Sequence, residues 1–174
     1  LSHVEFLRLI LEDEALCRKE RVAKSLKTRA KFRSHANLED WDHTFERGLS
    51  KAKLRELAAL SFYGSTENLL ILGKTGEGKT HLAVAVGQRL CAESVSVMFL
   101  PANFLFEEVL AAKAAGKYLA YVKRLTQTKA VILDDFGLRN YTHEEANVLV
   151  DLLEDRHRKG SVIVTSQVDP KGWK

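Results

Sequence analysis

The sequence has little cysteine, little proline and no long apolar run. Its two cysteines, Cys17 and Cys91, stand far apart and belong to no C-x-x-C pair, which argues against a zinc site and against a disulfide framework. We expect two idle thiols in a cytoplasmic protein. No apolar run approaches the roughly 20 residues that cross a bilayer, so no membrane partner is expected. The N-terminal segment contains acidic residues, Glu5 and Glu12 among them, which are not typical of a secretory signal peptide.

The remaining bulk properties are those of an ordinary globular chain. A length of 174 residues suits one domain with a modest appendage. The formal net charge of +4 is weak evidence for a polyanionic partner, because the position of the charges matters more than their sum. The chain begins without Met and ends shortly after a strand-like run, so we expect a fragment.

Residues 1–60 are predicted to form a small all-helical domain. This segment has no proline, and no glycine before Gly48, so it lacks the usual helix breakers. Ser2 and Glu5 have the spacing of a capping box, and apolar residues follow at helical spacing: Phe6, Leu7, Ile10, Leu11 and Leu16. Further apolar anchors are expected in a looser stretch: Leu38, Trp41 and Phe45.

Residues 61–174 are predicted to form an α/β domain. Four short apolar runs alternate with helical patterns: Leu69–Leu72, Val95–Leu100, Ala130–Asp134 and Ser161–Thr165. Strands that alternate with helices form a parallel sheet covered on both faces. The fold class expected is therefore a parallel sheet sandwiched by helices.

A phosphate-binding loop follows the first of these strands. The pattern G-x-x-x-x-G-K-[ST] is met at Gly73, Gly78, Lys79 and Thr80, between an apolar strand and a helix, as its mechanism requires. Glycines let backbone N–H groups cradle phosphate oxygens, and the helix N-terminus adds partial positive charge. Lys79 is expected at the β- and γ-phosphates, and the Thr80 hydroxyl on Mg²⁺. The alternative is a glycine-rich turn without a ligand. The nucleotide-binding candidates are Gly73, Lys74, Thr75, Gly76, Glu77, Gly78, Lys79, Thr80 and His81.

An apolar strand that ends in two carboxylates fits a Walker B element. Ala130–Asp134 and then Asp135 come about 55 residues after the loop. Asp134 is expected to hold Mg²⁺ through water, and Asp135 to orient or deprotonate the attacking water. The alternative is an Asp pair that caps a strand end.

A polar triplet, Thr165-Ser166-Gln167, follows the fourth strand. Ligand sites in open α/β sheets lie beyond the carboxyl ends of the strands, so Ser166 is a candidate for contact with the γ-phosphate or the attacking water. A simple strand-end turn explains the triplet equally well.

The N-terminal segment carries a basic run. From Arg18 to Arg33 there are eight basic residues and one acid, Glu20. A solvated helix face is the ordinary explanation. The alternative is sequence-independent contact with the phosphates of duplex DNA, and the DNA-binding candidates on this run are Arg18, Lys19, Arg21, Lys24 and Lys27.

With these elements in order, the chain resembles the IstB/DnaC family of AAA+ ATPases, and within it most of all the insertion-sequence transposition helpers. The resemblance covers nearly the whole chain. It rests on Glu67–Gly73, Gly78–Ala83, Leu133–Gly137, Glu154-Asp155-Arg156, Thr165-Ser166-Gln167, Leu38–Asp42 and Arg55–Ala58.

The resemblance implies an ATPase that assembles on DNA as an ATP-bridged homo-oligomer and recruits a transposase. The DnaC side of the family implies a replicative-helicase loader instead. A two-helix excursion, here Pro101–Leu125, faces DNA in related initiators, which adds Lys113 and Lys117 as candidates. A third possibility, from the loop alone, is a P-loop kinase or other phosphotransferase.

Two positions depart from the family pattern. Lys74 stands where the family usually has Pro, and Asp135 stands where many AAA+ proteins have Glu, which puts fast hydrolysis in doubt. The arginine finger and the lid of such proteins are expected to lie beyond Lys174.

Overall fold

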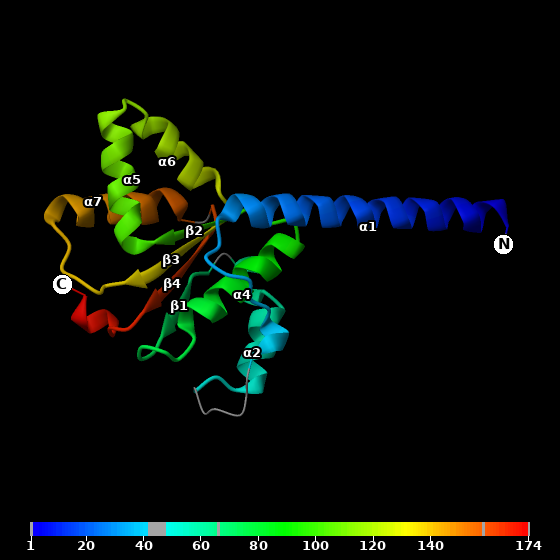
Figure 1. The fold of residues 1–174 in the computed structure, drawn as a ribbon, viewed down its shortest axis with the longest axis horizontal. Coiled ribbons are helices and arrows are strands. Elements are labelled where there is room, and N and C mark those ends of the chain that lie inside the picture. The colour runs from blue at the N-terminus through cyan, green and yellow to red at the C-terminus, as the bar shows by residue number, and fades with distance from the viewer. Residues whose placement is uncertain (1, 42–47, 66, 158, 174) are drawn as a thin grey trace.

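Four parallel strands form one sheet at the centre of the protein. The structure is a computed structural model that describes residues 2–41, 48–65, 67–157 and 159–173. The strands are β1 (Leu69–Leu72), β2 (Val97–Pro101), β3 (Ala130–Phe136) and β4 (Ser161–Ser166). Their order is β1-β4-β3-β2, and each neighbouring pair is parallel, as Figure 1 shows. The predicted parallel sheet is confirmed.

Helices cover both faces of this sheet. Helix α4 (Lys79–Ala92) lies on one face, and α5 (Ala102–Ala114), α6 (Tyr118–Gln127) and α7 (His143–Arg156) lie on the other. Because successive side chains of a strand point to opposite faces, consecutive residues of β3 enter different cores. Ile132 belongs to the α4 side, and Val131 and Leu133 belong to the α5–α7 side. The central strands are thus buried on both faces, which explains their continuous apolar sequence.

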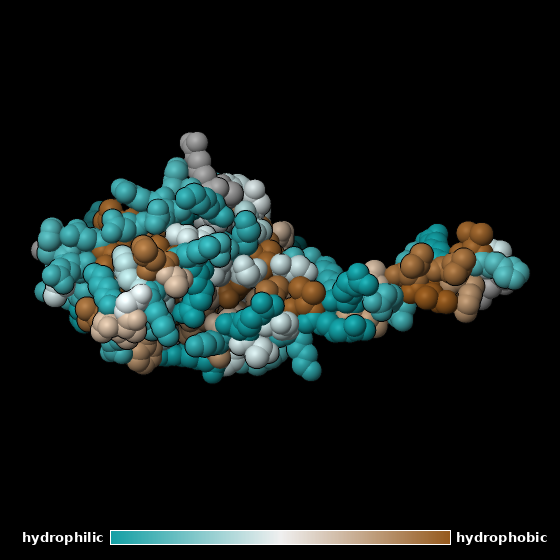
Figure 2. Space-filling model, turned by 90° about the horizontal axis from the view of Figure 1, so that it is seen from above, coloured by the Kyte–Doolittle hydropathy of each residue, from teal (hydrophilic) through white to brown (hydrophobic). Residues whose placement is uncertain are grey.

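A long helix, α1 (His3–Ala30), projects from this body (Figure 1). The capping box of Ser2 and Glu5 begins it, as expected. Its last residue, Ala30, is buried against α4 and β2. The apolar side chains of its first turns are exposed instead, with Leu11 at 69%, and Figure 2 shows them as an apolar tip on the projecting end.

Three short elements connect α1 to the sheet: η1 (Leu38–Asp40), α2 (Lys51–Ala58) and α3 (Ser61–Gly64). Leu38, Trp41, Leu57 and Phe62 pack in the same core cluster as α4. The predicted anchors Leu38 and Trp41 are therefore buried, whereas Phe45 and Asp42 lie outside the described residues. Side chains from both sides of residue 61 share this cluster, and a domain boundary at that position stays a prediction.

A buried arginine joins the far ends of three elements. Arg156, at the end of α7, is 1% exposed. Its guanidinium donates hydrogen bonds to the carbonyls of Leu125, Thr128, Lys129 and Ser161. Burial lowers the pKa of this guanidinium to about 10, so it stays charged at neutral pH. Arg156 thereby fixes the end of α6 and the starts of β3 and β4.

A 3₁₀ turn, η2 (Pro170–Gly172), follows β4. Among the residues that the structure describes, no helix has both the length and the apolar character needed to cross a bilayer.

Candidate nucleotide-binding site

The phosphate-binding loop joins the end of β1 to the start of α4. Gly78 is the N-cap of α4 and has φ +87°, and Gly76 has φ +84°. Both values lie in the left-handed region that glycine adopts without steric cost. The loop therefore turns so that α4 begins at Lys79, and the helix N-terminus faces the space where phosphates bind in such loops.

In this structure the loop binds its own polar groups. Lys79 is 8% exposed, and its Nζ donates to the carbonyl of Lys74 at 2.8 Å. The backbone N–H of Lys74 donates to Glu77 Oε2 at 2.7 Å. This carboxylate lies so close over Gly73 that a Cβ at that position would collide with it. The Lys79 ammonium and the Glu77 carboxylate thus form hydrogen bonds with the backbone of Lys74 in the same loop.

The two predicted magnesium ligands lie side by side. Thr80, in the first turn of α4, donates its hydroxyl to Asp134 Oδ1 at 2.9 Å. Asp134 is 0% exposed, and its Oδ2 has no hydrogen-bond partner among the described residues. A buried, unpartnered carboxylate oxygen beside a hydroxyl is a donor set suited to Mg²⁺, which prefers few carboxylates together with water. The residues present therefore fit this cation.

Asp135 occupies an irregular point of β3. The pairing register between β3 and β4 shifts between Leu133 and Phe136, and Asp135 has φ +56°. Asp tolerates the left-handed region better than most residues, and backbone strain of this kind gathers at functional sites. The irregularity follows Asp134 directly, so both Asp residues lie at the carboxyl end of β3, and a catalytic part for Asp135 stays a prediction.

Thr165, on the neighbouring strand β4, is the residue that sequence reasoning missed. Its hydroxyl donates to Asp134 Oδ1 at 2.7 Å and accepts the N–H of Asp135 at 2.9 Å. It therefore links both carboxylate residues through one side chain. The signal was present in the triplet, but the strand order that puts β4 beside β3 is not written in the sequence.

Ser166 lies on the other side of the strand end from Asp134. Its hydroxyl donates to the carbonyl of Phe136 at 2.7 Å and accepts from the Val168 N–H at 3.1 Å and from Trp173 Nε1 at 3.2 Å. These bonds hold the final turn against β3, and none of them leads to the loop. The strand end contacts the loop at two other points: the backbone carbonyl of Ser166 accepts the N–H of Gly73 at 3.3 Å, and the side chain of Gln167 accepts a hydrogen bond from the Thr75 hydroxyl. A catalytic part for Ser166 stays a prediction.

His81 lies in the first turn of α4, beside the N-terminal elements. Its ring centroid is 6.3 Å from that of Trp41, which is 7% exposed. The pair adds an aromatic wall next to the loop. All nine predicted nucleotide-binding residues are thus contiguous at one end of the sheet, together with Asp134 and Asp135.

The predicted DNA-binding residues occupy two separate projections. Arg18, Lys19, Arg21 and Lys24 are exposed on α1, and Lys27 is half-buried. Lys113 and Lys117 are exposed at the turn between α5 and α6, which rises from the sheet in Figure 1. Some of the charges on α1 are paired, because Arg18 lies 3.2 Å from Glu14 and Lys19 lies 2.9 Å from Glu93.

Comparison with known proteins identifies the family. The model of the family described as IstB-like ATP binding protein matches residues 1–174. This chain belongs to the IstB-like family. An insertion sequence ATP-binding protein of Sinorhizobium fredii is 35% identical to it over 173 residues, which cover 99% of this chain and 71% of that protein. The ATP-binding protein of insertion sequence IS21 from Pseudomonas aeruginosa is 34% identical over 173 residues, covering 99% of this chain and 65% of that protein.

Solved structures show the same fold at lower identity. DnaA from Aquifex aeolicus, bound to AMPPCP, superposes with a TM-score of 0.72 at 18% identity and covers 83% of this chain and 45% of that chain. The DnaC helicase loader superposes with a TM-score of 0.65 at 20% identity and covers 78% and 79%. The IstB-like chain thus has the AAA+ P-loop fold. The family description also supports ATP binding in general.

Proposed function

We propose that this protein is an ATP-dependent helper of DNA transposition, which assembles on duplex DNA and recruits or activates a transposase. The observation that carries the proposal is the meeting of Thr80 and Asp134 at 2.9 Å, beside the buried Lys79. These groups come from the start of α4 and from β3, 54 positions apart in the chain, and together they form a nucleotide site. The relatives named for insertion sequences supply the biological setting.

The nucleotide is ATP with Mg²⁺. On binding, Lys79 exchanges the carbonyl of Lys74 for the β- and γ-phosphates, and the N–H groups at the start of α4 bind phosphate oxygens. Thr80 and Asp134 would hold the cation, which supplies charge neutralisation between the β- and γ-phosphates. The AMPPCP bound to the DnaA of similar fold supports an adenine nucleotide.

Hydrolysis requires a positioned water. Asp135 accepts a proton from this water or orients it, and Thr165 fixes both neighbouring carboxylate residues so that the water meets the γ-phosphate in line. Asp135 is shorter than the glutamate of many AAA+ proteins, so slow hydrolysis is expected. A neighbouring copy in an ATP-bridged homo-oligomer would add an arginine.

DNA binding is assigned to the exposed basic side chains of α1 and of the α5–α6 turn. Helix α1 projects beyond the body (Figure 1), so its side chains reach a duplex without obstruction by the sheet. Contacts of this kind neutralise phosphates and release counterions, which gives affinity without sequence preference. The IstB-like chain would therefore bind duplex DNA of any sequence and could assemble at any position along it.

Two other functions compete with this proposal. A helicase loader is supported by the fold shared with DnaC, although at 20% identity against 35% and 34% for the insertion-sequence relatives. A P-loop kinase would require a substrate pocket at the loop, and family membership argues against it.

The experiment that tests the function measures ATP hydrolysis by this chain with and without duplex DNA, using Lys79→Ala as the control. The proposal expects a slow basal rate that duplex DNA raises and that the variant lacks. A rate that does not respond to DNA, or that persists in Lys79→Ala, would refute it. A DNA-stimulated rate that single-stranded DNA raises more strongly than duplex would favour the helicase loader.

A further inference from the structure

The outer edge of the sheet is bare along β2. This strand is the last in the order β1-β4-β3-β2 and pairs with β3 alone. Ala130 donates its N–H to the carbonyl of Ser96 at 3.0 Å, and backbone groups of a parallel strand alternate between its two sides. The N–H groups of Val97 and Phe99 therefore point away from β3. Among the described residues, none accepts them.

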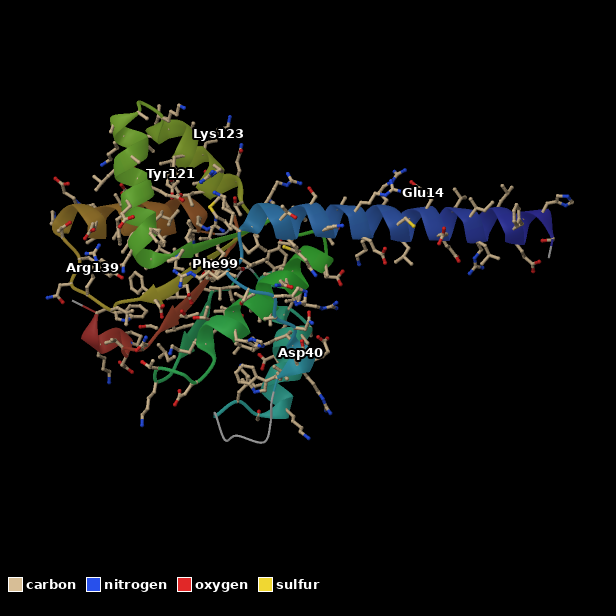
Figure 3. The ribbon with its side chains drawn as sticks, in the orientation of Figure 1. Glu14, Asp40, Phe99, Tyr121, Lys123 and Arg139 are labelled. Carbon is tan, nitrogen blue, oxygen red and sulfur yellow. The ribbon has the colours of Figure 1, made fainter. Side chains whose placement is uncertain are left out.

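This edge forms the floor of a groove between the two helical layers. A cavity of about 990 Å³ runs along all of Ser96–Pro101, with the inner end of α1 as one wall and α5 and α6 as the other. Leu26 from α1 and Phe104 from α5 supply apolar contact, and Phe104 is 49% exposed. Figure 3 shows Phe99 between the inner end of α1 and the α5–α6 pair. The groove shares none of its lining residues with the nucleotide site.

The α1 wall of the groove is basic, whereas the opposite wall carries two acids, Glu107 and Glu108, and one cation, Arg124. Arg29, Lys31 and Arg33 are exposed at the end of α1, and none of them makes an ion pair with a described residue. On the opposite wall Arg124 lies 3.4 Å from Glu108. A bound segment with acidic side chains would therefore meet unpaired cations on the α1 wall.

We propose that β2 receives an extended acidic peptide of a partner protein as an added strand. Unsatisfied backbone groups in a row require another backbone in extended form, which is the basis of strand addition to sheet edges. A β-strand rises about 3.3 Å per residue, so the groove beside six residues of edge takes a segment of about six residues. Apolar side chains of the peptide lie against Phe104 on the α5 wall, and acidic ones lie against the α1 wall.

The test uses a fluorescent, acetylated hexapeptide that alternates glutamate with valine and threonine, titrated into the protein without nucleotide or DNA. Two matched probes separate the contribution of charge from that of backbone hydrogen bonds. The first has lysine in place of glutamate. The second keeps the acidic sequence but has N-methylated alternate amides, which cannot donate hydrogen bonds to the strand edge. The proposal expects the acidic probe to bind at least about tenfold more tightly than either control, since each carries a defect in charge or in backbone pairing. Equal binding of all three probes would overturn it.

A pair of variants locates the binding. Arg29→Glu with Arg33→Glu should weaken the acidic probe at least about tenfold, whereas Lys51→Glu with Arg55→Glu on α2, an equal change of charge outside the groove, should leave it unchanged. Hydrogen exchange in the wild-type protein gives a measure that does not depend on the folding of a variant. Bound acidic peptide should slow exchange at Val97 and Phe99, and exchange at Met98 and Leu100, which face β3, should change little.

Three results would contradict the assignment. One is unaltered exchange at Val97 and Phe99 when the probe is saturating. Another is equal binding by the groove variant and the wild-type protein. The third is displacement of the peptide by a single-stranded oligonucleotide that protects the same two amides, because the groove would then be a nucleic-acid site.

Discussion

The Thr165 hydroxyl lies 2.7 Å from Asp134 Oδ1 and so connects β4 to the carboxylate that ends the buried part of β3. The hydroxyl oxygen of Thr165 also accepts a hydrogen bond from the backbone N–H of Asp135 at 2.9 Å. Asp134 also accepts from Thr80 of α4. Asp134 Oδ1 therefore accepts hydrogen bonds from hydroxyls of a helix and of a neighbouring strand, whereas Asp134 Oδ2 has no partner among the described residues and can bind a cation.

Replacing Thr165 tests whether this bridge positions the carboxylates. Thr165→Val keeps the shape of the side chain but leaves the Asp135 N–H unpaired, at a cost of about 1–2 kcal/mol in the free energy of unfolding. We expect the hydrolysis rate to fall roughly ten- to a hundredfold, because Asp135 is no longer held in place, while ATP affinity changes little. Thr165→Ser retains the hydroxyl and should stay near wild type. Equal rates for the Val and Ser variants would exclude a positioning part for Thr165.

Glu77 provides a test of the hydrogen bonds within the phosphate-binding loop. Its carboxylate lies over Gly73 and accepts the Lys74 N–H at 2.7 Å, where a negative charge repels an arriving phosphate. Removing the charge in Glu77→Gln should strengthen ATP binding at least about fivefold, since a like charge about 4 Å away costs about 1 kcal/mol even when water screens it fully. Calorimetric titration measures the affinity. Glu67→Gln, at the opposite end of β1, is the control, and an equal effect of both variants would rule out a local cause.

The basic face of α1 should govern DNA affinity. Exchange of Lys19, Arg21, Lys24 and Lys27 for Glu should weaken duplex binding and flatten its dependence on salt, by about one unit of slope for each lost phosphate contact. Fluorescence anisotropy at several salt concentrations supplies both quantities. Lys51→Glu, Lys53→Glu and Arg55→Glu together on α2 form the control. An unchanged affinity and slope in the α1 variant would remove DNA from the function of this helix.

Arg156 should be among the most sensitive positions for folding. Its loss removes a donor from four carbonyls, of which that of Lys129 keeps the N–H of Ser161, so Arg156→Met should reduce the free energy of unfolding by about 3 kcal/mol. Urea denaturation at neutral pH measures the change. Arg124→Met, which removes an exposed guanidinium, should cost less than about 1 kcal/mol. Comparable losses in the two variants would contradict the structural part given to Arg156.

The sequence predicted the elements that carry strong local signals. The helix expected directly after the phosphate-binding loop is α4, which spans Lys79–Ala92, because the loop sets its start. The start of β2 was expected at Val95 but lies at Val97. Ser94 adopts φ +63°, and Val95 donates its N–H to the carbonyl of Leu90. These residues therefore complete a Schellman cap of α4. The sequence does not predict this cap, because the left-handed position is held by Ser94 and not by the glycine that usually marks it.

Relationships between strands were beyond the reach of the sequence. The pattern of apolar runs indicates four parallel strands but not their order, and the order puts Thr165 rather than Ser166 on Asp134. The bulge at Asp135 likewise depends on pairing with β4. The groove beside β2 arises because α1 and α5 flank the same edge, a juxtaposition of segments about 75 residues apart in the sequence.

The central claim is that ATP at the Thr80–Asp134 site controls assembly of this protein on DNA. Its most direct test is the particle mass of the wild-type chain with duplex DNA in the presence of ATP, of ADP and of no nucleotide, measured beside Asp134→Asn. The account predicts particles of several copies on DNA with ATP, smaller ones in the other two conditions, and no response to ATP in the variant. A particle mass that is the same in all three conditions, or an Asp134→Asn variant that assembles like the wild type, would contradict it.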